Sequence, residues 1–141
     1  MSRASPEGDM RIGELSRRTG VSPRSLRYYE QNELLRSGRS ANGWREYEES
    51  CVGRVRKIAD LLRRGLTVEG IRQLDACLDL PDMEVCDDPG HAAEVYRARL
   101  GVLNDRLERL HAQRTNLMET LGELELAQSR VPDPAKPPGP A

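Results

Sequence analysis

The segment TGVSPRSLRYYE, residues 19–30, decides the fold of this chain. Ser22 is a favourable N-cap, and Pro23 is a favourable first helical residue because proline lacks the N–H group that would be left unpaired there. A helix is therefore predicted to run from this point through about Glu30, with Leu26 on its inner face.

A second short helix is predicted immediately before this segment. Ile12 and Leu15 are spaced i, i+3, which favours a helix over residues 11–18. The turn at residues 19–22 contains a glycine and separates the two helices. Two short helices joined by such a turn are typical of a helix-turn-helix.

The segment that follows the helix-turn-helix contains a strong hairpin signal. Asn42-Gly43 is the pair most typical of a two-residue hairpin, because both residues tolerate the positive φ that a type I′ turn demands. A small two-stranded hairpin with this pair near its tip is predicted. It forms a wing beside the two helices.

Two more helices are predicted to complete the domain. The first begins near Glu48 and ends at Gly65, and it carries Cys51 as a small core residue. The second is capped by Thr67 and ends at Pro81. Apolar residues spaced three or four apart define the inner faces of both helices: Val52, Val55, Ile58, Leu61, Leu62, Val68, Ile71, Leu74 and Leu78.

A long helix is predicted over residues 91–128. Its apolar residues repeat with heptad spacing, interrupted at Arg114, which is typical of a coiled coil. One helix cannot bury such a seam alone, and no other segment matches its length, so a second copy of the chain is the expected partner. The predicted seam consists of Tyr96, Leu100, Leu103, Leu107, Leu110, Leu117, Leu121 and Leu124.

The sequence thus predicts a mainly α protein. Its parts are a disordered N-terminal tail (1–9), a winged helix-turn-helix domain (10–80), an acidic hinge loop (81–90), a coiled-coil dimerisation helix (91–128) and a disordered Pro-rich tail (129–141).

The charge is unevenly spread along the chain. The net charge of −1 combines +5 in residues 1–73 (15 Lys+Arg, 10 Asp+Glu) with −6 in residues 74–141 (7 and 13). Such asymmetry favours a basic nucleic-acid-binding module joined to another part.

Side chains on the predicted recognition helix and wing are suited to DNA. Arginine binds guanine edges or phosphate, whereas Ser and Tyr reach phosphate oxygens. The candidate DNA contacts are Arg17, Arg18, Ser22, Arg24, Arg27, Tyr28, Arg39, Asn42, Trp44 and Arg45.

Residues 10–74 resemble the DNA-binding domain of the MerR family of bacterial transcription regulators. The matching stretches are RIGELS (11–16), TGVS (19–22), LRYYE (26–30), LL (34–35), NGWREY (42–47) and LRRGLT (62–67). Trp44 stands where the family more often has Tyr, and Glu33 stands where Gly commonly precedes the Leu-Leu pair.

The resemblance implies a specific mode of action. The long helix would pair antiparallel in a homodimer, which would bind a palindromic operator in double-stranded promoter DNA beside RNA polymerase. The dimer would bend the DNA and, when an effector acts, untwist it. DNA deformation is a physical source of specificity, because bending 20–30 base pairs costs of order 1–6 kcal/mol depending on sequence.

Cys77, Cys86 and His91 are the candidate sensing residues, because Cys86 lies in the hinge loop and the other two lie on either side of it. By the resemblance, Cys86 matches a metal ligand of metal-responsive relatives, but no cysteine follows it in this chain. Three alternatives stay open: the two thiols merely pack, they form a redox-sensitive disulfide, or Cys86 and His91 bind zinc together with Cys77 or with the Asp82, Asp87 and Asp88 carboxylates.

Several other classes of protein are excluded or disfavoured. No apolar run approaches the roughly 18 residues of a membrane span, no secretory signal begins the chain, and three cysteines are too few for a disulfide scaffold, so a cytoplasmic location is expected. No nucleophile–base pair, phosphate loop or complete metal motif indicates an enzyme. The remaining rival is a coiled-coil interaction protein whose basic domain docks on a protein such as RNA polymerase.

Overall fold

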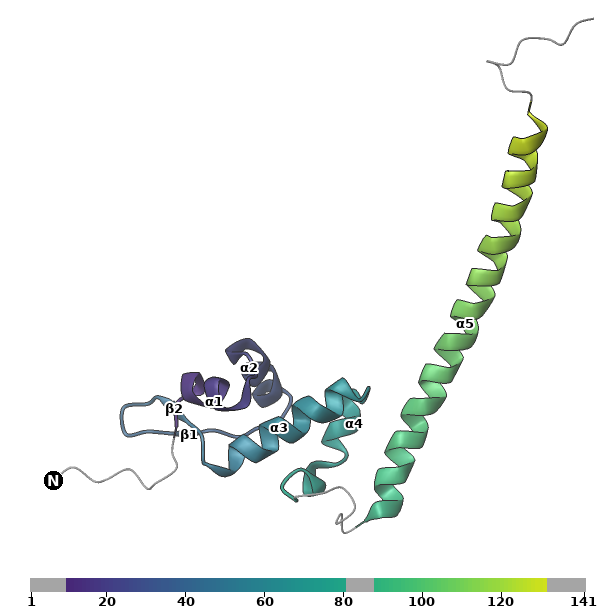
Figure 1. Cartoon of the computed structure of the whole chain (residues 1–141). Helices are drawn as coiled ribbons and strands as arrows, with labels where there is room; N and C mark the ends of the chain where they lie inside the picture. Colours follow the sequence, from purple (N-terminus) through teal and green to yellow (C-terminus); the bar gives the residue numbers. More distant parts are fainter. Residues whose placement is uncertain (1–9, 81–87, 132–141) are drawn as a thin grey trace, which may run out of the picture. The chain divides into compact units, whose positions relative to one another are not determined.

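The computed structural model of the protein describes residues 10–80 and 88–131. Its elements are α1 (Ile12–Thr19), α2 (Pro23–Gln31), β1 (Gly38–Arg39), β2 (Arg45–Glu46), α3 (Ser50–Arg63), α4 (Val68–Arg72), the 3-10 turn η1 (Asp75–Cys77) and α5 (Pro89–Arg130) (Figure 1). The predicted mainly α fold, with a small hairpin and a long last helix, is confirmed. The predicted tails 1–9 and 132–141 and residues 81–87 of the predicted hinge lie outside the described residues.

The two helices of the helix-turn-helix form because their ends are satisfied locally. Gly20 ends α1 with φ +74°, and its N–H donates to the Ser16 carbonyl at 2.9 Å. The Ser22 hydroxyl accepts from the Ser25 N–H at 3.1 Å, with Pro23 in the first helical position. Leu15 and Leu26 are fully buried between the helices. Both predicted helices are confirmed to within about one residue at each end.

One hydrophobic core joins α1–α4 and the first turns of α5. Cys51 belongs to it as predicted, and it is buried and free. Burial raises the pKa of the Cys51 thiol. The largest fully buried side chains are Tyr47, Leu15, Leu26, Leu34, Leu35, Ile58, Ile71, Leu74, Leu78 and Val55.

The wing is present, but the predicted type I′ turn is wrong. β1 and β2 pair antiparallel, with Gly38 opposite Glu46 and Arg39 opposite Arg45. Gly43 has φ +78°, whereas Asn42 does not have a positive φ. The N–H of Gly43 donates to the carbonyl of Ser40 at 2.9 Å, which closes a four-residue turn over residues 40–43 whose last residue is the left-handed glycine.

The fourth helix is shorter than predicted. α4 ends at Arg72, and the chain then tightens into η1 through i→i+3 hydrogen bonds, such as Cys77 N–H to the Leu74 carbonyl at 2.8 Å. Ile71, Leu74 and Leu78 remain buried through this change. The apolar spacing therefore gave the correct core residues and an incorrect helix length. Pro81, its predicted end, lies outside the described residues.

The chain divides into two compact units, one ending at Arg99 and one beginning at Leu100. The first turns of α5 belong to the first unit, since Ala92 and Val95 are buried in its core. The Arg99 side chain donates to the Gly65 carbonyl at 2.7 Å. Of the helices in the described ranges, none is long and apolar enough to cross a membrane.

Candidate nucleic-acid interface

The outer face of α2 presents the predicted recognition residues. Leu26 and Tyr29 point into the core, so Arg24, Arg27 and Tyr28 occupy the opposite, exposed side of the helix. Half of the Tyr28 surface is exposed (50%), and it is among the few large apolar side chains of the first unit left uncovered. An exposed aromatic side chain beside two arginines is suited to a DNA surface.

A groove lies between α1, α2 and the wing. It brings together predicted residues from all three elements, and it adds Arg11, which the sequence pattern did not single out. Acidic side chains are also present, Glu14 and Glu46. The remaining lining residues are Met10, Ile12, Gly13, Arg17, Arg27, Arg39, Gly43, Trp44 and Arg45.

The wing is tied to α2 through Glu30. Its carboxylate accepts hydrogen bonds from the hydroxyls of Ser37 (2.5 Å) and Tyr47 (3.1 Å), and it forms an ion pair with Arg45 at 3.3 Å. Burial, together with the neighbouring Glu30 carboxylate, raises the pKa of Tyr47 to about 12. These contacts fix the wing relative to the recognition helix.

Arg18 is held by an intramolecular partner. Its guanidinium forms a two-pronged ion pair with the Glu49 carboxylate, with one N–O distance of 2.6 Å. The hydrogen bond from Arg18 lowers the pKa of Glu49, and the same bond raises the pKa of Arg18. The Arg56 side chain donates to the Arg18 backbone carbonyl at 2.7 Å. A DNA contact by Arg18 would require its release from Glu49.

Of the other predicted DNA contacts, Arg39 lines the groove, whereas Ser22 and Asn42 do not. Arg39 donates to the Gly43 carbonyl at 3.3 Å within the wing, while Ser22 is occupied as the α2 cap. Asn42 is exposed at the turn. The structure therefore gathers Arg17, Arg27, Arg39, Trp44 and Arg45 in the groove, with Arg24, Tyr28 and Asn42 exposed beyond its lining.

Of the candidate sensing residues, Cys77 and His91 do not line this groove. Cys77 is buried and disulfide-bonded, whereas Cys86 lies outside the described residues. His91 is exposed on α5, with its Nε2 atom 3.0 Å from the Gln73 carbonyl. Within residues 10–80 and 88–131, no three His, Cys, Asp or Glu side chains cluster as a metal site.

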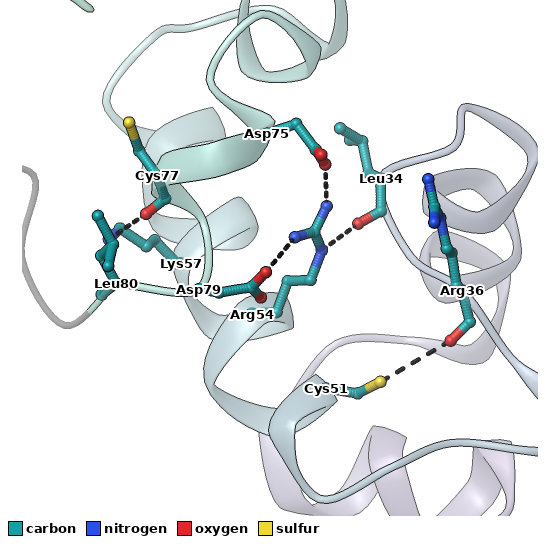
Figure 2. Close-up of polar contacts among 9 residues, drawn as sticks. All are labelled: Leu34, Arg36, Cys51, Arg54, Lys57, Asp75, Cys77, Asp79 and Leu80. Carbon is teal, nitrogen blue, oxygen red and sulfur yellow. Dashed lines mark hydrogen bonds and ion pairs between the residues drawn. The ribbon is translucent and has the colours of Figure 1, made fainter. Parts of the chain in front are cut away.

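Two cations on α3 hold the segment around Cys77 (Figure 2). Lys57 donates to the backbone carbonyls of Cys77 and Leu80, at 2.9 and 2.5 Å. Arg54 forms ion pairs with Asp75 and Asp79. It also donates to the Leu34 carbonyl at 2.6 Å. η1 is therefore bound to α3 and, through Arg54, to the loop that follows α2.

Comparison with known proteins agrees with this geometry. Residues 10–76 match the profile of the MerR HTH family of regulatory proteins. The chain is 31% identical over 115 residues to the HTH-type transcriptional regulator HmrR of Rhizobium leguminosarum bv. viciae, covering 82% of this chain and 83% of HmrR. It is 28% identical over 116 residues to ZntR of Escherichia coli K12, covering 82% of this chain and 75% of ZntR.

The fold also resembles a solved structure. The transcription regulator PbrR691 from Ralstonia metallidurans CH34, in complex with lead(II), superposes with a TM-score of 0.63 at 28% identity. The match covers 78% of this chain and 83% of that one.

Proposed function

Because this chain belongs to the MerR family of DNA-binding transcriptional regulators, which are not enzymes, we propose that it binds a palindromic promoter operator as a homodimer. It controls transcription by bending and untwisting the DNA between the promoter elements. The observation that carries the proposal is the arginine-lined groove between α1, α2 and the wing. Clustered arginines attract the phosphate backbone, and an exposed helix face such as that of α2 fits the major groove.

The part of α5 that begins at Leu100 supports the homodimer. Its seam leucines are more than half exposed in the single chain: Leu100, Leu107, Leu110, Leu117, Leu121 and Leu124. A helix of 42 residues with an uncovered heptad seam is stabilised by an equally long partner, which a second copy supplies. The dimer acts in the cytoplasm, with RNA polymerase at the same promoter.

The disulfide at Cys77 supports thiol oxidation as the signal that the protein senses. In this step two thiols lose two electrons and two protons to an oxidant such as a peroxide, and a disulfide forms. A metal ion is the second candidate, because PbrR691 was solved with lead(II). If replacing Cys77 by Ser leaves the response to peroxide unchanged while metal salts still induce transcription, the metal candidate stands.

Operator binding is tested by selection from a pool of genomic DNA fragments, followed by footprinting. The expected result is a protected palindrome inside a promoter. Fragments of equal length that carry the site at different positions should migrate differently in gels when the protein is bound, as expected for bent DNA. Absence of any protected palindrome would contradict the proposal and favour docking on a protein.

A further inference from the structure

We propose that Arg11 is an additional phosphate-binding residue of the operator interface, and that Trp44 in the wing holds its guanidinium in position. The inference rests on the proposed operator binding. The sequence patterns that identify the recognition helix and the wing do not include Arg11, because it lies immediately before α1.

The geometry of the pair comes from two distant segments. The Arg11 guanidinium carbon lies 5.0 Å from the centre of the Trp44 ring, which is within the range of a cation–π contact. The backbone of Arg11 is fixed, because its carbonyl accepts from the Leu15 N–H at 3.1 Å. The backbone of Trp44 is fixed as well, since its carbonyl accepts from the Ser40 N–H at 2.8 Å.

The contact with Trp44 leaves the donors of the guanidinium available. The guanidinium carbon lies over the indole ring, and in the described residues none of the five guanidinium N–H donors of Arg11 makes a hydrogen bond. In the described part of the chain Arg11 makes no ion pair, unlike Arg18 and Arg45, which bind Glu49 and Glu30. Arg11 is therefore held in place with its donors and its charge available.

The surroundings of Arg11 point to an anionic ligand. The guanidinium lines the same groove as Arg17, Arg27 and Arg39. These four arginines outnumber the two acidic residues of the groove, Glu14 and Glu46, so the groove keeps a net positive charge that attracts phosphates. Trp44 remains 57% exposed, which leaves one side of the wing open to the DNA backbone. An exposed tryptophan that orders an arginine lowers the entropic cost of binding a phosphate.

The salt dependence of operator binding tests the role of Arg11. The logarithm of the binding constant falls linearly with the logarithm of the salt concentration, and each phosphate contact adds about 0.9 to the magnitude of this slope. Arg11→Gln, which removes one contact from each protomer of the dimer, should reduce the slope by about 1.8. Arg109→Gln removes the same charge from α5, outside the groove and the seam, and serves as the matched control.

The outcomes separate the inference from the proposed function. A reduced slope in Arg11→Gln, with the slope of Arg109→Gln unchanged, is the expected result. If Arg11→Gln weakens binding at every salt concentration without changing the slope, Arg11 only supports the wing and the inference is wrong. If the wild-type protein binds no operator, the proposed function fails, and the inference fails with it.

Substitution of Trp44 tests its positioning role. Trp44→Ala should weaken operator binding, and Trp44→Tyr should restore it because an aromatic face remains for Arg11 to stack on. In the Arg11→Gln background, the effect of Trp44→Ala should be clearly smaller than in the wild type. Equal effects in both backgrounds would show that Trp44 acts independently of Arg11 and would overturn this part of the inference.

Discussion

Glu33 adopts φ +61° two residues after the end of α2, and in the described ranges no other non-glycine residue has a positive φ. This conformation costs an L-residue about 1–2 kcal/mol. Glu33→Gly should therefore raise the free energy of unfolding by about 1 kcal/mol in urea denaturation. The exposed ion pair between Glu33 and Arg72 (3.0 Å) offsets little of this gain.

The matched control for this substitution is Glu33→Ala. It also removes the ion pair with Arg72, but it keeps the Cβ atom and hence the backbone strain. Glu33→Gly should be the more stable of the two variants. Equal stability would show that the left-handed conformation carries no significant cost here.

Tyr47 makes the stability depend on pH in alkaline solution. Its pKa is about 12 in the folded protein, against 10 as the ordinary value, because the phenol is buried and lies beside Glu30. Below pH 10 the phenol is neutral in both states. Above pH 10 the unfolded state ionises first, so the free energy of unfolding should fall by up to about 2.7 kcal/mol between pH 10 and 12.

Urea denaturation at a series of pH values measures this fall. In Tyr47→Phe the fall should be smaller, because no phenol titrates at this position. The pKa of Tyr29 is also raised by burial, so a residual fall is expected in the variant. Identical pH profiles for the wild type and Tyr47→Phe would contradict the assignment.

At the scale of elements, local capping signals predicted helices well. The Ser22 cap and Pro23 placed the start of α2 correctly, because these contacts lie within one turn of the chain. α4 and η1 were less predictable. The helix gives way to a 3-10 turn in a segment held by Arg54 and Lys57 of α3, and these contacts span 20 or more residues. Apolar spacing alone does not carry such information.

The seam of α5 gives a matched pair of substitutions. Leu117 is 72% exposed in the single chain and belongs to the predicted seam, whereas Leu126 is 60% exposed and lies outside the predicted seam. Leu117→Asp should reduce the dimer fraction in sedimentation velocity by an order of magnitude or more, because it places charge at a buried contact. Leu126→Asp should leave the dimer intact. If both variants remain dimeric, the predicted seam is wrong.

At the scale of the whole molecule, the charge asymmetry along the sequence corresponds to the distribution of elements in the structure. The basic half contains the arginine-lined groove, and the acidic half contains η1 and α5. The presence of an arginine surface was therefore predictable from the sequence.

The contacts that these arginines make with other side chains of the protein were not predictable from the sequence. The pairing of Arg18 with Glu49 spans 31 residues, and the stacking of Arg11 on Trp44 joins α1 to the wing. Neither contact has a local signature, because both form only when the tertiary fold brings distant segments together.

The central claim is that the exposed face of α2 reads operator DNA, and the affinity of Arg27→Ala for the operator tests it most directly. Binding by the wild type, Arg27→Ala and Arg109→Ala is measured on one palindrome at fixed salt, with sedimentation confirming the dimer. Loss of one good base contact costs about 1–3 kcal/mol. The affinity for the operator should therefore fall by roughly 5-fold to 150-fold for each of the two Arg27 contacts that the dimer loses. Arg109→Ala should bind as the wild type does. Unchanged affinity of an intact Arg27→Ala dimer would contradict the claim.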